Sequence, residues 1–159
     1  MAAGVTTKVL DSVTITNEIA LDLGSSIATP ESKTSFTLAN GTGALKASKE
    51  FSDTRTIGGA PDDLDLNSGG LTDSHGSAVS FTKVKVLKVS AKATNAGNVT
   101  IGAAAATQFS AFLGGATHTI VLRPGYSITL AGSDAAGYAV GAGATDVLRI
   151  AGTNADIYS

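Results

Sequence analysis

The segment Val13-Thr-Ile-Thr-Asn-Glu-Ile-Ala-Leu-Asp-Leu23 alternates aliphatic and polar side chains. In a β-strand, successive side chains point to opposite faces of the sheet. The aliphatic residues of the segment would therefore share one face: Val13, Ile15, Ile19, Leu21 and Leu23. This alternation predicts a strand in a sheet that has one face against a core and the other in water.

The rest of the chain has the same β-like character. Its 159 residues suit one compact domain. From Asn95 onward, short apolar segments alternate with turn residues, a spacing typical of sandwiches and jelly rolls. We therefore expect an all-β protein, with an antiparallel β-sandwich or jelly-roll-like single domain over residues 13–159. An extended N-terminal arm, Met1–Ser12, precedes it, with simple disorder of that segment as the alternative.

Glycine, proline and asparagine mark the expected reversals of the chain. Gly24–Lys33 is rich in small and polar residues and should be a loop. Asn40-Gly41 suits a type I′ turn, which predicts an antiparallel hairpin with its return strand in residues 44–57. The turn sequence Arg123-Pro-Gly-Tyr126 predicts a further hairpin.

Two longer segments lie between these turns. Val79–Lys92 is the longest strand candidate, but the parity of its apolar residues changes twice, which predicts a β-bulge or bend. Gly58–Ser77 is acidic and rich in glycine. We expect it to be a surface excursion that contains a short strand with Leu64 and Leu66 pointing inward.

Composition narrows the classes of partner. The 11 basic and 13 acidic residues give a net charge of −2, and no stretch combines lysine and arginine with aromatic residues, so nucleic acid is not an expected partner. Cysteine is absent, which fits assembly in a reducing cytoplasm. Neither a signal peptide nor a run of roughly 20 apolar residues is present, so no membrane anchor is expected.

The strongest site-like cluster is Asp63-Leu-Asp-Leu-Asn67. Its alternate oxygen-bearing side chains resemble the opening of a calcium loop, because Ca²⁺ takes six or more oxygen ligands. However, Ser68 and Ser74 stand where an EF-hand loop requires glycine and a bidentate glutamate. The alternative is a strand with inward leucines and aspartates in water.

Other residues with catalytic potential are few. His75 and His118 are the only histidines, which is too few ligands for a zinc site without cysteine. Asp73, His75 and Ser77 have the residue types of a hydrolytic triad, but one short segment does not normally bring three such side chains together. We therefore assign no catalytic, cofactor-binding or metal-ligating residue, and expect no enzyme and no cofactor.

Two further patterns concern ligand binding. Tyr126, Tyr138 and Tyr158 are candidates for a sugar-stacking platform, with core-edge tyrosines that keep a wet hydroxyl as the alternative. Gly41-Thr-Gly43 and Gly114-Gly115 lack the strand-to-helix context that phosphate binding requires, so both are expected to be turns.

The second half of the chain, from Leu64 onward, resembles the head decoration (cement) proteins of tailed bacteriophages. The resemblance is one of layout, and the segments that carry it are Leu64-Asp-Leu-Asn-Ser-Gly-Gly-Leu-Thr-Asp73, Val79-Ser-Phe-Thr-Lys-Val-Lys-Val-Leu87, Asn98-Val-Thr-Ile-Gly102, Arg123-Pro-Gly125, Gly137-Tyr-Ala-Val140 and Asp146-Val-Leu-Arg-Ile150. No counterpart of the first third of the chain is found in that layout.

This resemblance implies a virion structural protein that is assembled in the host cytoplasm and binds the outside of the major capsid shell. It also implies a homo-oligomer, with a trimer favoured, and the major capsid protein as partner. Met1–Ser12 and exposed loops would contact the shell. The alternatives are a tail, neck or baseplate β-module and a carbohydrate-binding or adhesion module.

Overall fold

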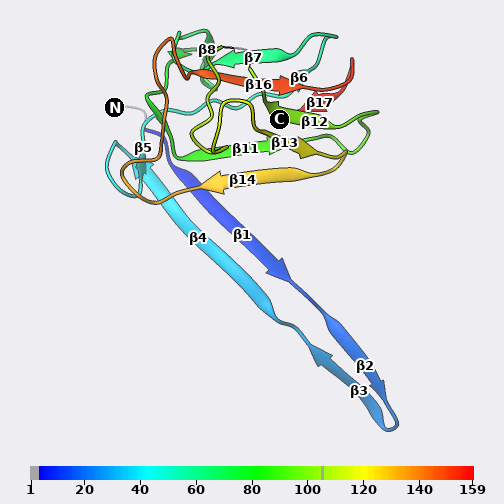
Figure 1. The fold of residues 1–159 in the computed structure, drawn as a ribbon. Helices are drawn as coiled ribbons and strands as arrows, with labels where there is room; N and C mark the ends of the chain where they lie inside the picture. The colour runs from blue at the N-terminus through cyan, green and yellow to red at the C-terminus, as the bar shows by residue number, and fades with distance from the viewer. Residues whose placement is uncertain (1–3, 105) are drawn as a thin grey trace.

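The computed structural model of this protein describes residues 4–104 and 106–159, and every regular element within these ranges is a β-strand. Figure 1 shows two parts, a compact β body and a long two-stranded ribbon that projects from it. The all-β class predicted from the sequence is confirmed. Within the same ranges, no helix is long and apolar enough to cross a membrane.

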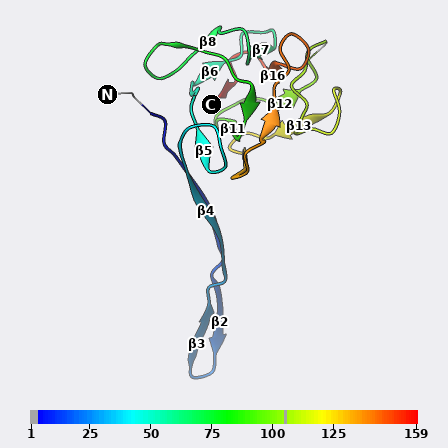
Figure 2. The ribbon, with the colours of Figure 1, turned by 90° about the vertical axis from the view of Figure 1, so that its left-hand side faces the viewer.

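The ribbon has two limbs joined by a distal turn. Its strands are β1 (Thr7–Thr14), β2 (Asn17–Leu21), β3 (Gly24–Ala28) and β4 (Glu31–Asn40). β1 pairs with β4 and β2 with β3, both antiparallel, and the distal turn lies far from the body (Figure 2). Between the two strand pairs, the Ile15 N–H donates to the Pro30 carbonyl at 3.0 Å. The register is therefore unchanged from base to tip.

Two expectations about the N-terminal third were wrong. The predicted loop Gly24–Lys33 is β3 and the start of β4, because its backbone pairs with the first limb. The predicted arm Met1–Ser12 is not a separate element, since Thr7–Ser12 belongs to β1 and pairs with β4. Met1–Ala3 lies outside the described residues. The projecting part of the chain is thus Thr7–Asn40.

The predicted alternation over Val13–Leu23 is present, but the aliphatic face is not buried within this chain. Val13 and Ile15 are each 58% exposed and Ile19 is 56% exposed. Beyond its base the ribbon has only two strands, and no second layer formed by the described residues covers it. The aliphatic face is therefore exposed like the polar one. The expected burial of this face was wrong.

The body contains one four-stranded sheet and several two-stranded ones. The four-stranded sheet has the order β13-β12-β16-β7, with all neighbours antiparallel. Its strands are β7 (Asp62–Asp65), β12 (Val99–Gly102), β13 (Thr119–Leu122) and β16 (Val147–Ala151). The other pairs are β6 (Arg55–Thr56) with β17 (Ile157–Tyr158), β8 (Leu71–Thr72) with β9 (Ala78–Val79), β10 (Lys83–Val84) with β15 (Tyr138–Ala139), and β11 (Val86–Ser90) with β14 (Ser127–Ala131).

The hydrophobic core lies in the body and is built mainly from aliphatic side chains. Phe109, Ile101 and Val99 have no exposed surface, and Leu64 and Leu66 point into the same cluster, as predicted. Leu64 in β7 and Leu66 just after it are buried, whereas Asp63 and Asp65 alternate with them on the other face, as expected. Strands β7, β11, β12 and β16 all contribute core residues, and this shared core joins the separate sheets into one body.

The predicted hairpin at Asn40-Gly41 was wrong. The chain leaves β4 through a loop and returns as β5 (Lys46–Ala47), which runs parallel to β4. The ammonium group of Lys85 donates to the carbonyls of Gly43 and Lys46 and so ties the loop to the body. Of the predicted return strand over residues 44–57, only β5 and β6 are strands. A long-range contact thus overrides the local turn signal.

The bend predicted in Val79–Lys92 is confirmed, because the segment divides into β9, β10 and β11, which pair with three different strands. The predicted turn at Arg123–Tyr126 is also confirmed. The Tyr126 N–H donates to the Arg123 carbonyl at 3.0 Å, and Gly125 has a φ of 82°. The hairpin expected there was wrong, since β13 and β14 on either side of the turn belong to different sheets.

Candidate interaction surface

The ribbon has one nearly uncharged face, which we call the aliphatic row and define by Val13, Ile15 and Ile19. Residues directly opposite each other in an antiparallel pair lie on the same face. Val13 lies opposite Ser32 and Ile19 opposite Ser26, so small uncharged side chains complete this face. No ionisable side chain occurs on it from Val13 to the distal turn.

The opposite face of the ribbon is polar and charged. Lys8, Glu18, Glu31 and Lys33 lie on it, according to the register. The Ser12 hydroxyl donates to the Glu31 carboxylate at 3.1 Å, which links the two limbs across this face. Two aliphatic residues interrupt it, and both are exposed: Leu10 at 58% and Ile27 at 60%. The two faces therefore suit different surroundings.

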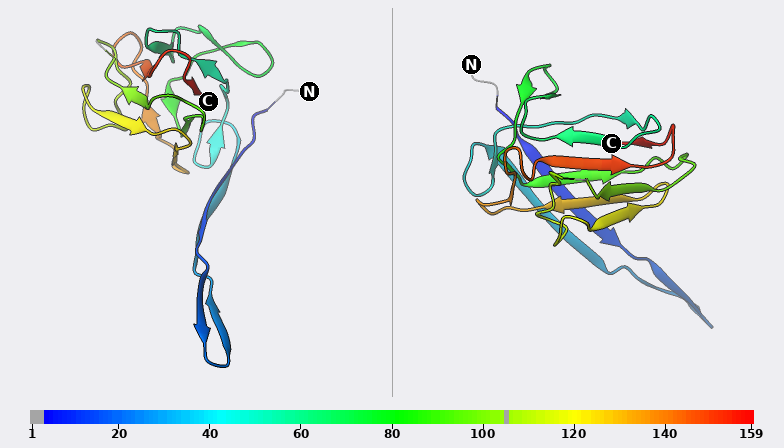
Figure 3. Two further views of the ribbon diagram at one scale, coloured as in Figure 1. Left: turned by 90° about the vertical axis from the view of Figure 1, so that its right-hand side faces the viewer. Right: turned by 45° about the horizontal axis from the view of Figure 1, so that its top comes forward.

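The distal turn also presents an apolar side chain. Leu23 stands at the turn and is 103% exposed. Figure 3 shows that, among the described residues, only the two limbs of the ribbon lie near this end. The side chain of Leu23 is therefore left in solvent.

The edges of the ribbon are also open. β4 gains a second neighbouring strand only at Ala39 and Asn40, where β5 pairs with it. Beyond that point, neither limb has another strand partner among the described residues. Unpaired strand edges carry free N–H and C=O groups and can accept a strand from another chain.

The base of the ribbon is fixed to the body. Leu38 is fully buried and Val9 is 8% exposed, in contrast with the side chains farther along the ribbon. The loop that follows β4 is bonded to the body: the Leu45 N–H donates to the Ser133 carbonyl at 2.7 Å, and the Lys83 ammonium group donates to the Thr42 carbonyl at 3.5 Å. A cavity of about 490 Å³ lies beside this base and is lined largely by core side chains and lysine stems. The body therefore holds one end of the ribbon and leaves the rest in solvent.

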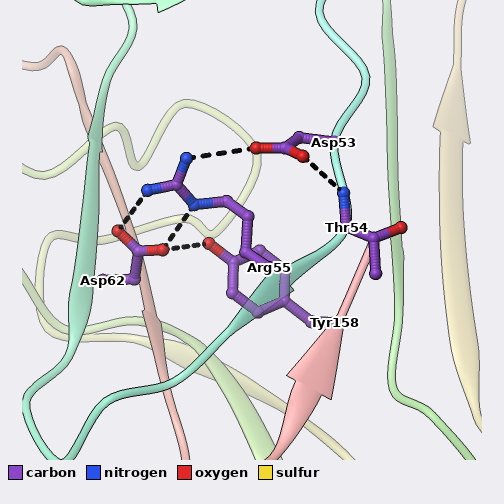
Figure 4. A network of polar contacts seen from close by, with 5 residues as sticks. All are labelled: Asp53, Thr54, Arg55, Asp62 and Tyr158. Carbon is purple, nitrogen blue, oxygen red and sulfur yellow. Dashed lines mark hydrogen bonds and ion pairs between the residues drawn. The ribbon is translucent and has the colours of Figure 1, made fainter.

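Apart from the ribbon, the body contains a cluster of charged and polar side chains that are bonded to one another (Figure 4). Arg55 Nε donates to Asp62 Oδ2 at 2.6 Å, and the Tyr158 hydroxyl donates to the same oxygen at 2.7 Å. Arg55 also donates to Asp53 at 3.2 Å, and Asp53 accepts from the Thr54 N–H at 2.8 Å. Because these residues lie on β6, β7, β17 and the approach to β6, the cluster connects the end of the chain with its middle.

The electrostatics of this cluster stabilise fixed protonation states. Burial and the hydrogen bond to Asp62 raise the pKa of Tyr158, and the hydrogen bond to Asp62 raises the pKa of Arg55. Burial works to raise the pKa of Asp62, but hydrogen bonds from Arg55 and Tyr158 outweigh it and hold that pKa below its usual value. All three pKa values move away from neutrality, whereas a general acid or base works best near the ambient pH. The cluster is a structural clamp.

The calcium-loop candidate Asp63–Asn67 is occupied by internal contacts. Asp63 forms a two-pronged ion pair with Arg149 at 2.7 Å, which lowers the pKa of its carboxyl group. Asp65 accepts from the N–H groups of Asn67 and Ser68 at 3.0 and 2.9 Å. Within the described residues, no group of three His, Asp or Glu side chains is placed to hold a metal ion.

The remaining sequence candidates lie apart or in turns. Asp73 accepts from the backbone N–H groups of His75 and Ser77 at 2.9 and 2.8 Å, so the carboxylate closes a turn. His118 lies elsewhere, with its Nδ1 2.9 Å from the Leu113 carbonyl oxygen.

The three tyrosines do not form a platform. Tyr126 is 61% exposed and Tyr138 is 37% exposed, but Tyr158 is a core residue whose hydroxyl belongs to the clamp. A stacking surface made of all three residues is therefore contradicted. Gly41–Gly43 and Gly114–Gly115 lie in turns and bends outside the strands, as expected.

The sequence analysis did not predict that the ribbon projects from the body as an exposed surface. The alternation in Val13–Leu23 indicated the first limb, but Gly24–Lys33 has no matching alternation of its own, so nothing showed that it pairs with that limb. The useful signal was the set of threonines in the second limb, Thr29, Thr34 and Thr37, since β-branched residues favour strands. No family model, curated protein or solved structure matches this chain.

Proposed function

We propose that this protein is a virion structural protein, a capsid decoration (cement) protein that binds the outside of the major capsid shell and stabilises it. The observation that carries the proposal is the ribbon, Thr7–Asn40, which projects from a small body and exposes aliphatic side chains, open edges and an apolar tip. Large exposed apolar surfaces on small proteins mark interaction sites.

The body suits a platform role in this proposal. β11 contributes Val89 and the four-stranded sheet contributes Ile101 and Leu148 to one core, which supports a sandwich or jelly-roll-like body. Lys85 and the base of the ribbon connect this platform to the projection. The body would sit on the outer shell surface while the ribbon extends over neighbouring subunits.

The proposal assigns the protein no enzymatic step and no cofactor. The carboxylates Asp62, Asp63 and Asp65 support ion pairs and turns, and the pKa shifts in the clamp stabilise fixed charges. Binding in a symmetric oligomer, with a trimer favoured, would multiply weak individual contacts into high avidity. The major capsid protein is the proposed partner, and the virion surface the proposed location after assembly in the host cytoplasm.

The test shortens the ribbon without changing its register. Residues 16–29 are replaced by Asn-Gly together with Pro30→Thr, so that Ile15 and residue 30 close a two-residue hairpin turn with the N–H that proline lacks. The variant and the parent protein are incubated with purified undecorated shells, and bound protein is quantified after sedimentation. We expect the parent to bind at a copy number comparable with the shell subunit and the shortened protein to lose binding by at least about tenfold.

Two results would contradict the proposal. Absence of parent binding to shells would exclude the decoration role, and unchanged binding by the shortened protein would exclude the ribbon as the gripping element. A few copies per particle would instead indicate a tail, neck or baseplate position. A variant with a conservative change in the body, Lys92→Arg, controls for handling, since Lys92 is an exposed residue outside the ribbon.

A further inference from the structure

We propose that the cavity beside the base of the ribbon binds a small anionic amphiphile, a molecule with an apolar chain and one negatively charged head group. The volume of the cavity, about 490 Å³, is within the range of roughly 300–1,000 Å³ that is typical of ligand pockets. Parts of residues 41–53 and the whole of residues 80–90, which include β10 and β11, line it. This inference goes beyond the shell-binding role and does not depend on it.

The cavity has an apolar wall. Phe51, Phe81 and Leu87 line it, and these side chains pack against the hydrophobic core while remaining partly accessible. The buried core residues Leu64 and Val89 also contribute to its lining. Covering apolar surface that water reaches is favourable, roughly in proportion to the area covered. The wall therefore favours a ligand with an apolar chain.

Basic side chains are concentrated around the same cavity. Six of the 11 basic residues of the chain line it, although the net charge of the whole chain is −2: Lys46, Lys49, Arg55, Lys83, Lys85 and Lys88. Among the described residues, only two carboxylate side chains line it, those of Glu50 and Asp53. A cleft with an excess of one charge raises the local concentration of ions of the opposite charge. The lining therefore favours an anion.

Both carboxylates of the lining have partners other than the lysines. Glu50 accepts hydrogen bonds from the hydroxyl and the N–H group of Ser74, and Asp53 accepts one from Arg55. In the described part of the chain, the ion pairs are formed by Arg55 and Arg149 and by no lysine. The lysines of the cavity thus carry positive charge that no carboxylate in contact with them neutralises.

Lys85 gives the strongest indication of an anionic head group. Only 9% of this residue is exposed, and its ammonium group donates to the carbonyls of Gly43 and Lys46. Buried charges are usually paired with an opposite charge, because leaving water is costly for an ion. Asp134 acts on Lys85 through its charge, but its carboxylate accepts hydrogen bonds from two backbone N–H groups. A head group beside Lys85 would neutralise this buried charge by direct contact.

Two further ammonium groups lie at the wall of the cavity. Lys49 donates to the Ser80 carbonyl at 2.7 Å and Lys83 to the Thr42 carbonyl at 3.5 Å, and both acceptors belong to residues of the lining. An ammonium group has three N–H donors, so Lys49 retains donors for a ligand. Because lysine acts as a point charge without a fixed geometry, a carboxylate and a phosphate are equally suitable as the head group.

The first test compares three ligands that share an eight-carbon chain and differ in the charge of the head group: octanoate, octanol and octyltrimethylammonium. Each is titrated into the purified full chain by isothermal titration calorimetry, below its micelle concentration. We expect octanoate to bind at one site at least about tenfold more tightly than octanol, and octyltrimethylammonium to bind more weakly than octanol, because lysines attract only the anion. Absence of octanoate binding, or equal binding of the three ligands, would overturn the inference.

The apolar wall is tested with a series of carboxylates of increasing length: acetate, butanoate, hexanoate and octanoate. Affinity should rise by about fourfold for each CH₂ group, because each one is transferred from water to the apolar wall. An affinity that does not change with chain length would show that the lysines alone hold the anion. That result would contradict a site for an amphiphile.

Two double variants test the location of the site. Lys46→Gln with Lys49→Gln removes two positive charges from the lining, whereas Lys33→Gln with Lys92→Gln removes two from exposed lysines outside it. The Lys46/Lys49 variant should bind octanoate at least about fivefold more weakly and octanol as the parent does, since only the anion responds to the lost charge. The Lys33/Lys92 variant should stay within about twofold of the parent for both ligands. Near-ultraviolet circular dichroism checks that each variant is folded, and equal effects of the two variants on octanoate would overturn the assignment to this cavity.

These results are distinguishable from a failure of the proposed function. Selective octanoate binding by a protein that binds no shells would support this inference and exclude the decoration role alone. A protein that binds shells but no octanoate would overturn this inference alone. Shells that displace bound octanoate would identify a segment of the shell as the occupant of the cavity and would overturn the assignment to a small amphiphile.

Discussion

At the scale of residues, charge is used in this protein to hold distant strands together. Asp62 accepts hydrogen bonds from Arg55 and Tyr158, and Asp63 beside it pairs with Arg149 from β16. The two adjacent carboxylates of β7 therefore bind different strands. Asp62 connects β7 to β6 and β17, and Asp63 connects it to β16. Such networks are strongly directional and specify one pairing of strands.

The clamp makes a prediction for acid stability. Because the folded pKa of Asp62 is depressed, its contribution is present above the unfolded aspartate pKa and is lost as pH falls through the folded pKa. Asp62→Asn should lower the free energy of unfolding by about 1–3 kcal/mol at neutral pH. It should also flatten the dependence of that free energy on pH below the ordinary aspartate pKa of 3.8.

The measurement is denaturant unfolding at a series of pH values. Asp53→Asn is the matched control, because Asp53 contacts the same arginine but lies nearer the solvent, with 46% of its side chain exposed. Its effect at neutral pH should stay within about 0.5 kcal/mol. Identical pH profiles for the parent and Asp62→Asn would show that the clamp does not contribute to acid stability.

At the scale of elements, the ribbon and the body have different sources of stability. Each residue of the hydrophobic core cluster lies between Ile57 and Tyr158, so the body does not depend on the distal ribbon. The ribbon depends on the body at its base, through Leu38 and Val9. Beyond the base, backbone pairing and the hydrogen bond from Ser12 to Glu31 hold the two limbs together.

Because the ribbon and the body are stabilised separately, two changes within Thr7–Asn40 should have different effects on the free energy of unfolding. Replacing residues 16–29 by Asn-Gly, together with Pro30→Thr, should change the free energy of unfolding of the body by less than about 1 kcal/mol, because no core residue is removed. Leu38→Ala should cost about 2–4 kcal/mol, since Leu38 is fully buried. Thermal unfolding followed by near-ultraviolet circular dichroism measures both. A large loss of stability in the shortened protein would contradict the separate stabilisation of the two parts.

At the scale of the whole molecule, a compact body carries a ribbon that projects away from it (Figure 1). The body buries its apolar side chains in one core, whereas the ribbon exposes Val13, Ile15 and Leu23 to solvent. Under the proposed function, binding to the shell would cover this apolar surface, which favours association.

Hydrogen exchange should show the same contrast. In dilute protein, the amides of β2 and β3 should exchange at least about a hundredfold faster than those of β12 and β16, because a two-stranded ribbon opens more easily than the central strands of a sheet. Adding shells should slow exchange in β2 and β3 and leave β12 unchanged. Ribbon amides as protected as those of β12 in dilute protein would contradict this picture.

Several features of the fold could be predicted from local sequence. The two-faced strand at Val13–Leu23, the inward leucines of Leu64–Leu66, the bend in Val79–Lys92 and the turn at Arg123–Tyr126 all depend on side-chain parity or on residues that fix backbone angles. These are short-range properties. Local sequence therefore determined where the chain forms strands and where it bends in these segments.

The partners of the strands were decided by tertiary structure. Asn40-Gly41 suits a hairpin, but bonds from Lys85 to Gly43 and Lys46 place the next strand parallel to β4. The Arg123–Tyr126 turn passes between two sheets because the neighbouring strands find partners elsewhere along the chain. The clamp was also beyond sequence reasoning, since Asp62 and Tyr158 are brought together only by folding.

The aliphatic row shows the boundary between the two kinds of information. The sequence by itself determined that Val13, Ile15 and Ile19 share one face, because the backbone of a strand alternates its side chains. Only the tertiary structure decided that this face projects into solvent. Its position depends on pairing with Gly24–Asn40 and on the lack of a covering layer, and neither is a property of the strand itself.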